Sequence, residues 1–255
     1  MAVTMLMSRR ARVCLWLLAG AGFAHLAVAQ TLDSHPVFDV GDKWTYRHQN
    51  IGDRKDPYTF TNQTYKSEEG SAWLYGESQD PQSARKTFVW RYDYKRGDAM
   101  EGFEFDAASP KLIGKRFSNR QKLDDSIQFP LAVGKKYTVT ENWNDGNGNT
   151  KYDVEVETFE KVKTEAGEFD AYRIKLAGWW TRTGNGSGTG RAEQTIYFAP
   201  AVKRIVKSEY VDRLNNGARS GANVRELIKW EPKAPLPAAI AQTVAAPAAP
   251  ASAAQ

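Results

Sequence analysis

The chain has little of the chemistry on which most enzyme sites depend. Its 255 residues include one cysteine, Cys14, and three histidines. A lone cysteine cannot form an intramolecular disulfide or a thiolate metal site, and nucleophilic catalysis most often needs a histidine base. The G-x-S-x-G turn of serine hydrolases is missing too, because Gly186-Ser187-Gly188 lies in a glycine loop between strands. We therefore expect no catalytic residues, no metal and no cofactor.

Two glycine-rich turns resemble ligand loops in composition but not in pattern. Asp145–Asn149 places oxygens at alternate positions, yet Thr150 stands where a calcium loop needs glycine and Val156 where it needs glutamate. The loop Gly184–Gly190 lacks the lysine and the following helix of a phosphate cradle. We interpret both as hairpin turns.

One catalytic arrangement stays open, the carboxylate pair of glycoside hydrolases, because spacing in space is invisible in a sequence. Glu155 and Glu157 lie opposite the apolar side of their strand, and Asp93 lies opposite an aromatic side. Such carboxylates are typical of a solvated strand face. A carboxylate-dependent hydrolase is therefore the least favoured function.

Long apolar runs are absent except near the N-terminus. Arg9, Arg10 and Arg12 precede the short apolar run Cys14–Val28, which ends in an A-x-A sequence at Ala29. This pattern predicts a signal peptide over residues 1–29 rather than an uncleaved anchor, and Cys14 lacks the small neighbours of a lipidation site. We expect a protein exported to the periplasm or secreted, from a Gram-negative bacterium, with no transmembrane segment in the mature chain.

The excess of positive charge belongs mostly to this leader. The net charge of +5 includes the three leader arginines, so the rest of the chain is nearly balanced. This balance, together with export, argues against a nucleic-acid partner.

At the other end, residues 232–255 are rich in alanine and proline. Proline at this density blocks helix and sheet, and alanine offers little surface to bury, so we predict a disordered tail. The functional alternative to a solvated tail is a spacer or docking segment for an envelope protein or a cell-wall partner.

Alternation of apolar and polar residues fills the domain between leader and tail, residues 30–231. In Lys151–Val162 and Gly167–Thr181 apolar side chains recur at every second position, and helical periodicity is almost absent. The fold class is therefore all-β and antiparallel. Long strands and large aromatics favour a single, strongly curved, half-barrel-like sheet, with a β-sandwich as the alternative. Residues 107–125 fit a long loop or one short helix.

Aromatic residues are the one enrichment with chemical content. Phe88, Trp90, Tyr92 and Tyr94 form a stripe on one strand face, which fits a packed core or the lining of a cavity. Trp179 and Trp180 are consecutive, so their rings point to opposite faces. These six residues are the candidate ligand contacts, through a curved apolar face or by stacking on sugars.

Three segments carry a resemblance to a known group: FPLAVGKKYTV (129–139), VKTEAGEFDAYRIKL (162–176) and YFAPAVKRIVKSEY (197–210). They resemble uncharacterised exported bacterial β-rich proteins that are similar to the curved half-barrels of periplasmic lipoprotein carriers. The resemblance covers Phe129–Tyr210. It implies a half-barrel and, by analogy alone, lipid binding, and no catalytic residues are established for the group.

Residues and resemblance together predict a non-catalytic envelope binding module for an apolar, amphiphilic or carbohydrate ligand. The alternative is an envelope structural or interaction protein that uses its Ala/Pro tail.

Overall fold

The structure is a computed structural model that describes residues 31–52, 56–83, 86–94, 98–106, 111–118, 127–143, 147–184 and 186–245. The predicted signal peptide lies outside these residues. Within them the elements are β1 (Thr31–Leu32), β2 (Lys43–Asn50), β3 (Tyr58–Glu68), β4 (Ser71–Ser78), β5 (Thr87–Asp93), β6 (Asp98–Asp106), β7 (Lys111–Ser118), β8 (Leu131–Ala132), β9 (Lys136–Trp143), β10 (Gly148–Thr164), β11 (Gly167–Arg182), β12 (Gly188–Ala199), η3 (Pro200–Val202), β13 (Arg204–Leu214), β14 (Arg219–Glu231) and α1 (Ala238–Ala245).

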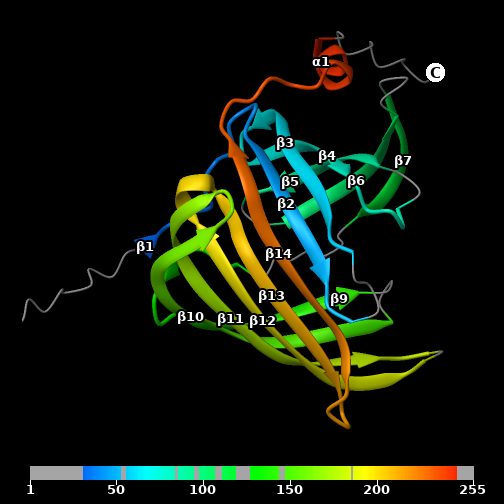
Figure 1. Ribbon diagram of the computed structural model, residues 1–255, viewed down its shortest axis with the longest axis vertical. Helices are drawn as coiled ribbons and strands as arrows, with labels where there is room; N and C mark the ends of the chain where they lie inside the picture. Colours follow the sequence, from blue (N-terminus) through cyan, green and yellow to red (C-terminus); the bar gives the residue numbers. More distant parts are fainter. Residues whose placement is uncertain are drawn as a thin grey trace, which may run out of the picture.

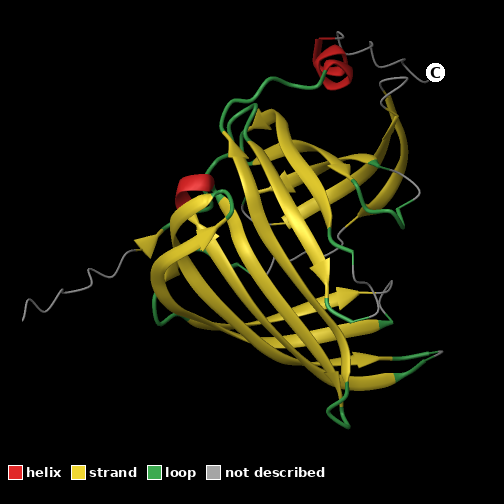
Figure 2. Ribbon diagram, viewed as in Figure 1, coloured by secondary structure: helices red, strands yellow, loops and turns green. Residues whose placement is uncertain are grey.

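One antiparallel sheet dominates the molecule, in the order β7-β6-β5-β4-β3-β2-β14-β13-β12-β11-β10-β9. Its end strands β7 and β9 do not pair with each other, so the sheet is open. Figure 1 shows it strongly bent, with β9 to β12 in the lower part, β3 to β7 in the upper part and β14 extending from one part to the other. The prediction of a single curved antiparallel sheet is confirmed, and Figure 2 shows how little helix accompanies it.

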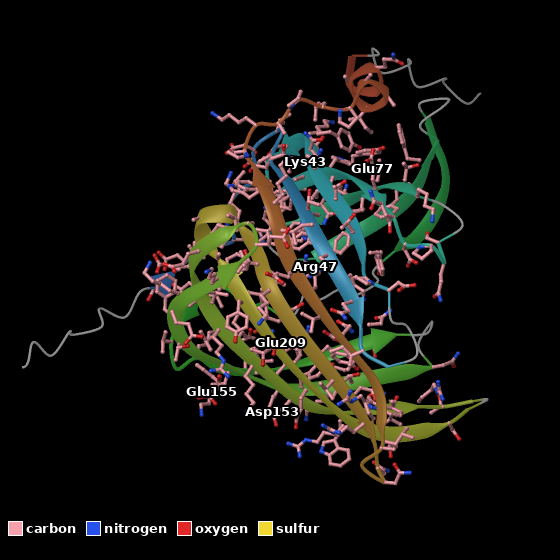
Figure 3. The ribbon with its side chains drawn as sticks, in the orientation of Figure 1. Lys43, Arg47, Glu77, Asp153, Glu155 and Glu209 are labelled. Carbon is pink, nitrogen blue, oxygen red and sulfur yellow. The ribbon has the colours of Figure 1, made fainter. Side chains whose placement is uncertain are left out.

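The long hairpin β10–β11 shows how the alternation sets the two faces of the sheet. Tyr152, Val154 and Val156 are buried, whereas Asp153 between them is exposed. Register places Val154 opposite Leu176 and Asp153 opposite Ala177, so the pattern continues across strands. We call the face that carries Val154 the inner face and the face that carries Asp153 the outer face. The six charged residues labelled in Figure 3 belong to strands of this sheet.

The inner face is filled by apolar side chains in two clusters. One cluster joins the inner sides of β2, β4 and β5 to Val202, Val206 and Leu227. The other joins β9 to β13 to Ile127 and Leu131, which precede β9 in the chain. Burial of this apolar surface is the main stabilising contribution to the fold.

The N-terminal segment 33–42 closes the space between the two clusters. The His35 ring lies 5.1 Å from the Tyr92 ring in the first cluster and 5.9 Å from the Phe198 ring in the second. Its Nδ1 donates to the Pro36 carbonyl oxygen (2.8 Å), and its Nε2 accepts from the Tyr92 hydroxyl (2.9 Å). His35 and Phe38, a few residues after the predicted cleavage site, are therefore part of the core.

A charged clamp holds the end of this segment. Nζ of Lys203, directly after η3, lies 2.6 Å from Oδ2 of Asp39 and 2.8 Å from Oδ2 of the buried Asp42. The lysine's hydrogen bond and charge lower the pKa of Asp39 below its usual value. The clamp ties the β12–β13 connection to the segment that leads into β2.

The C-terminal segment differs from the predicted disordered tail over residues 232–245. Nε2 of Gln63 donates to the carbonyl oxygens of Ala234 (3.0 Å) and Pro235 (3.1 Å), and α1 follows. Ile240 is 1% exposed and packs with Tyr75 on the outer face of β4. Residues 246–255, the rest of the predicted tail, lie outside the described residues.

One local prediction needs correction. Residues 111–118, expected in a long loop or short helix, form strand β7, which pairs with β6 through two register shifts. Those shifts interrupt the period of two by which a strand is recognised. Pro200 begins the short helix η3, and the β12–β13 pairing shifts register just before it, at Tyr197/Phe198.

Candidate binding surface

The aromatic stripe of β5 packs into the core. Trp90 is 6% exposed and Tyr92 is 2% exposed, while Phe88 and Tyr94 are half-buried against the same cluster. Phe88 stacks on Trp90 with their ring centroids 5.0 Å apart. The Tyr94 hydroxyl accepts a hydrogen bond from the Phe38 backbone N–H (2.8 Å). Tyr92 and Tyr94 therefore hold the chain's own N-terminal segment. A ligand role for the four residues of the stripe stays a prediction.

The two consecutive tryptophans of β11 separate as predicted. Trp180 lies on the inner face at 7% exposure, while Trp179 lies on the outer face at 61% exposure. No ring contact or cation–π contact involves Trp179 among the described residues. An indole with most of its surface in water is unusual for so large an apolar side chain, and it offers a stacking surface.

Basic residues flank Trp179 on the neighbouring strands. Register places Lys151 of β10 on one side of Trp179 and Arg191 of β12 on the other. Arg191 lies opposite Arg213 of β13. All three basic residues are exposed. We call Lys151, Trp179, Arg191 and Arg213 the basic row.

A groove lies beside the basic row, toward the middle of β11. Its volume is about 540 Å³, and its lining includes Thr138, Asp153, Glu155, Lys175 and Ala177. Ala177 precedes Trp179 by two residues, so both lie on the outer face about 7 Å apart along the strand. In Figure 3 Asp153 and Glu155 are labelled in this lower region of the sheet. The groove combines charged and hydroxyl groups with a small, apolar floor.

Neutral polar residues lie on the other side of the basic row, toward the hairpin tips. Register aligns Asn149, Thr181 and Thr189 across β10, β11 and β12. Beyond them a second depression of about 590 Å³ lies between the β11–β12 and β13–β14 tips and includes Thr189 and Asn215. The side-chain amide of Asn215 donates to the Thr189 hydroxyl oxygen. The outer face thus offers a continuous polar strip around Trp179.

Comparison with solved structures finds proteins of the kind that the sequence resembles. One, provisionally described as a lipoprotein from Parabacteroides distasonis, is 12% identical with a TM-score of 0.45, covering 79% of this chain and all of its own. An exported protein of Bacteroides fragilis with a YmcC-like fold, also so described provisionally, is 12% identical with a TM-score of 0.40, covering 78% of this chain and all of its own.

The hypothetical lipoprotein YmcC of Escherichia coli is 12% identical with a TM-score of 0.35, covering 77% of this chain and 85% of its own. By these descriptions two of the three are lipoproteins and one is an exported protein. No residue role is carried over from them. No protein-family model and no curated protein matches the chain.

The inner face carries a polar cluster that the sequence does not reveal. Burial, together with the negative charges of Glu141 and Asp212, raises the pKa values of Tyr152 and Tyr210. These four residues come from β9, β10 and β13, so only the folded register brings them together. Both tyrosines therefore stay protonated, and the Tyr210 hydroxyl forms a side-chain hydrogen bond with Asp212.

A buried cation forms a second unforeseen feature of the inner face. The Arg204 guanidinium carbon lies 5.5 Å from the Phe38 ring centroid, 5.3 Å from that of Trp44 and 5.9 Å from that of Tyr92. Arg204 is 6% exposed, so these ring faces stabilise a charge that has left water. The arrangement supports the N-terminal segment through Phe38.

The sequence singles out Trp179 but misses its surroundings. Lys151, Arg191 and Arg213 are far apart in the chain and meet only through strand register. Among the described residues, no group of three or more His, Cys, Asp or Glu could hold a metal ion. None of the helices in that part of the chain is long and apolar enough to cross a membrane.

Proposed function

We propose that this protein is a non-catalytic binding module of the bacterial envelope that holds a carbohydrate chain on the outer face of β9 to β13. The observation that carries the proposal is the exposed Trp179 ring between two depressions lined with polar groups. A sugar presents an apolar C–H face and a rim of hydroxyls. An exposed indole suits the first, and carboxylate, amide, hydroxyl and ammonium groups suit the second.

The strip has a length suited to an extended ligand. From Lys175 to Thr181 the outer face of β11 runs about 20 Å. Along it a ligand would meet Ala177 in the groove, then the Trp179 ring, then Thr181. The strip lies on paired strands in the middle of a hairpin, which holds its side chains at fixed spacing.

Burial of the inner aromatic stripe favours this face over the inner one. A ligand against Phe88 to Tyr94 would have to displace His35 and Phe38, which pack on Tyr92 at 5.1 and 5.2 Å between ring centroids. The outer strip needs no rearrangement of the core, so a carbohydrate there is better supported than an apolar ligand inside.

Binding of the protein to a panel of polysaccharides, measured by isothermal titration and affinity electrophoresis, tests the proposal. Wild type should bind at least one of them. Trp179→Ala should weaken that binding by about 2 kcal/mol, or roughly 30-fold, because a central aromatic contact is lost. Trp179→Phe keeps a stacking ring and should lose less.

A matched control is Ile51→Ala, because Ile51 is another exposed apolar residue, in the loop after β2 and away from the strip. It should bind like wild type. Absence of binding across the panel, or equal binding by wild type and Trp179→Ala, would overturn the proposal.

A further inference from the structure

We infer that the carbohydrate is an acidic one, whose carboxylate, sulfate or phosphate groups are bound by Lys151, Arg191 and Arg213 while a sugar ring stacks on Trp179. This inference rests on the proposed function and adds the charge class of its ligand. The basic row is the observation that carries it.

Like charges on directly opposed strand positions destabilise a sheet, yet Arg191 and Arg213 are register partners. The series continues, because Arg213 lies opposite Arg219 of β14 across a register shift. Other parts of the outer face are arranged differently: Arg47 bonds to Glu226, its register partner, and Lys136 bonds to Glu155, its partner. The run of basic residues thus departs from the pattern of the face around it.

The charges of the row are only partly neutralised within the protein. Nε of Arg191 lies 3.2 Å from Oε1 of Glu193 on the same strand, in an exposed pair of little energetic value. Lys151 and Arg213 form no ion pair with the described residues. An anionic ligand would therefore find exposed cations whose charge is not already matched.

The surroundings direct such a ligand toward the hairpin tips. On the groove side of the row, Asp153 and Glu193 would repel an anion. On the tip side the next aligned residues are Asn149, Thr181 and Thr189, which are neutral and can donate hydrogen bonds. The anionic groups are therefore expected between the basic row and these residues.

The spacing suits a linear polyanion. Neighbouring strands are about 4.8 Å apart, so the row extends about 14 Å from Lys151 on β10 to Arg213 on β13. A chain lying across the strands can reach all three cations and still place one ring on Trp179. An anionic lipid surface fits less well, because a flat contact would bring Asp153 and Glu193 against the same negative surface.

The test compares polygalacturonate, which carries a carboxylate on every sugar, with dextran, which is neutral. Wild type should bind polygalacturonate about tenfold more tightly at low salt, and the difference should shrink as salt rises from 50 to 200 mM. Lys151→Gln/Arg213→Gln should remove most of this preference, so that the affinity for polygalacturonate falls close to the affinity for dextran. Lys163→Gln, an exposed lysine at the far end of β10, is the matched control and should change neither.

Each outcome separates the two proposals. Equal binding of both polysaccharides, or an unchanged preference in the double variant, overturns the acidic ligand while carbohydrate binding through Trp179 stands. If neither polysaccharide and no other glycan binds, both proposals fail. Both proposals also fail if the protein binds only vesicles of anionic phospholipid or only single-stranded DNA.

Discussion

Gly190 lies opposite Trp180 on the neighbouring strand, and the Trp180 ring covers it so closely that a larger residue would not fit there. The Trp180 ring lies where a side chain at position 190 would begin, since a Cβ on Gly190 would come within 2.5 Å of that ring and closer still to the Arg213 carbonyl oxygen. At Gly188 the same ring would lie 3.7 Å away, at ordinary contact distance. Two glycines of one strand thus have different roles.

This difference gives a prediction for stability. Gly190→Ala should lower the free energy of unfolding by about 1–3 kcal/mol, because the new methyl group must displace the Trp180 ring or the backbone of β13. Gly188→Ala should change it by less than about 0.5 kcal/mol. Urea denaturation followed by circular dichroism measures both. Equal effects of the two substitutions would show that the ring does not lie over Gly190.

At the scale of elements, the strands could be predicted from the sequence more reliably than the segments that cover them. Alternation and turn residues predict the β10–β11 hairpin, because an exposed face and a buried face impose the period of two. The same reasoning could not find β7, where register shifts break the period. It also assigned residues 232–245 to a disordered tail on composition, although Ile240, together with Leu236 and Ala239, gives that segment an apolar anchor on β4 and β5.

Ile240 should therefore control docking of the C-terminal segment. Ile240→Ala removes most of a side chain that α1 buries. Such a truncation lowers the free energy of unfolding by about 2–5 kcal/mol in a well-packed site. Amide hydrogens of residues 238–242 should then exchange faster, while those of β12 stay protected. Gln242→Ala, at an exposed position of the same helix, is the control. Unchanged exchange in Ile240→Ala would mean that other contacts hold the segment.

For the whole molecule, composition and period were enough to predict one open, curved antiparallel sheet. They could not predict which face is free. The aromatic stripe of β5 has the pattern expected of a ligand cavity. In the folded protein it packs against His35 and Phe38, which lie more than 50 residues earlier in the chain. Conversely the basic row has no local pattern, because its members come from four strands whose register is set by the long hairpins.

The molecule is thus a sheet whose inner face is occupied by its own N-terminal segment and whose outer face is available along the polar strip around Trp179. On the outer face of the upper part, the C-terminal segment covers Tyr75 and Val89. The proposed ligand surface is confined to the lower part, on β9 to β13.

Hydroxyl-radical footprinting read by mass spectrometry, with and without saturating polygalacturonate, tests this assignment of faces most directly. Without ligand, Trp179 should be oxidised rapidly and Trp90 and Trp180 slowly, in line with their exposure of 61%, 6% and 7%. With ligand, Trp179 should be protected and the other two unchanged. A Trp179 that is oxidised at the same rate in the saturated complex, or protection that appears at Phe88 and Tyr94 instead, would contradict the account.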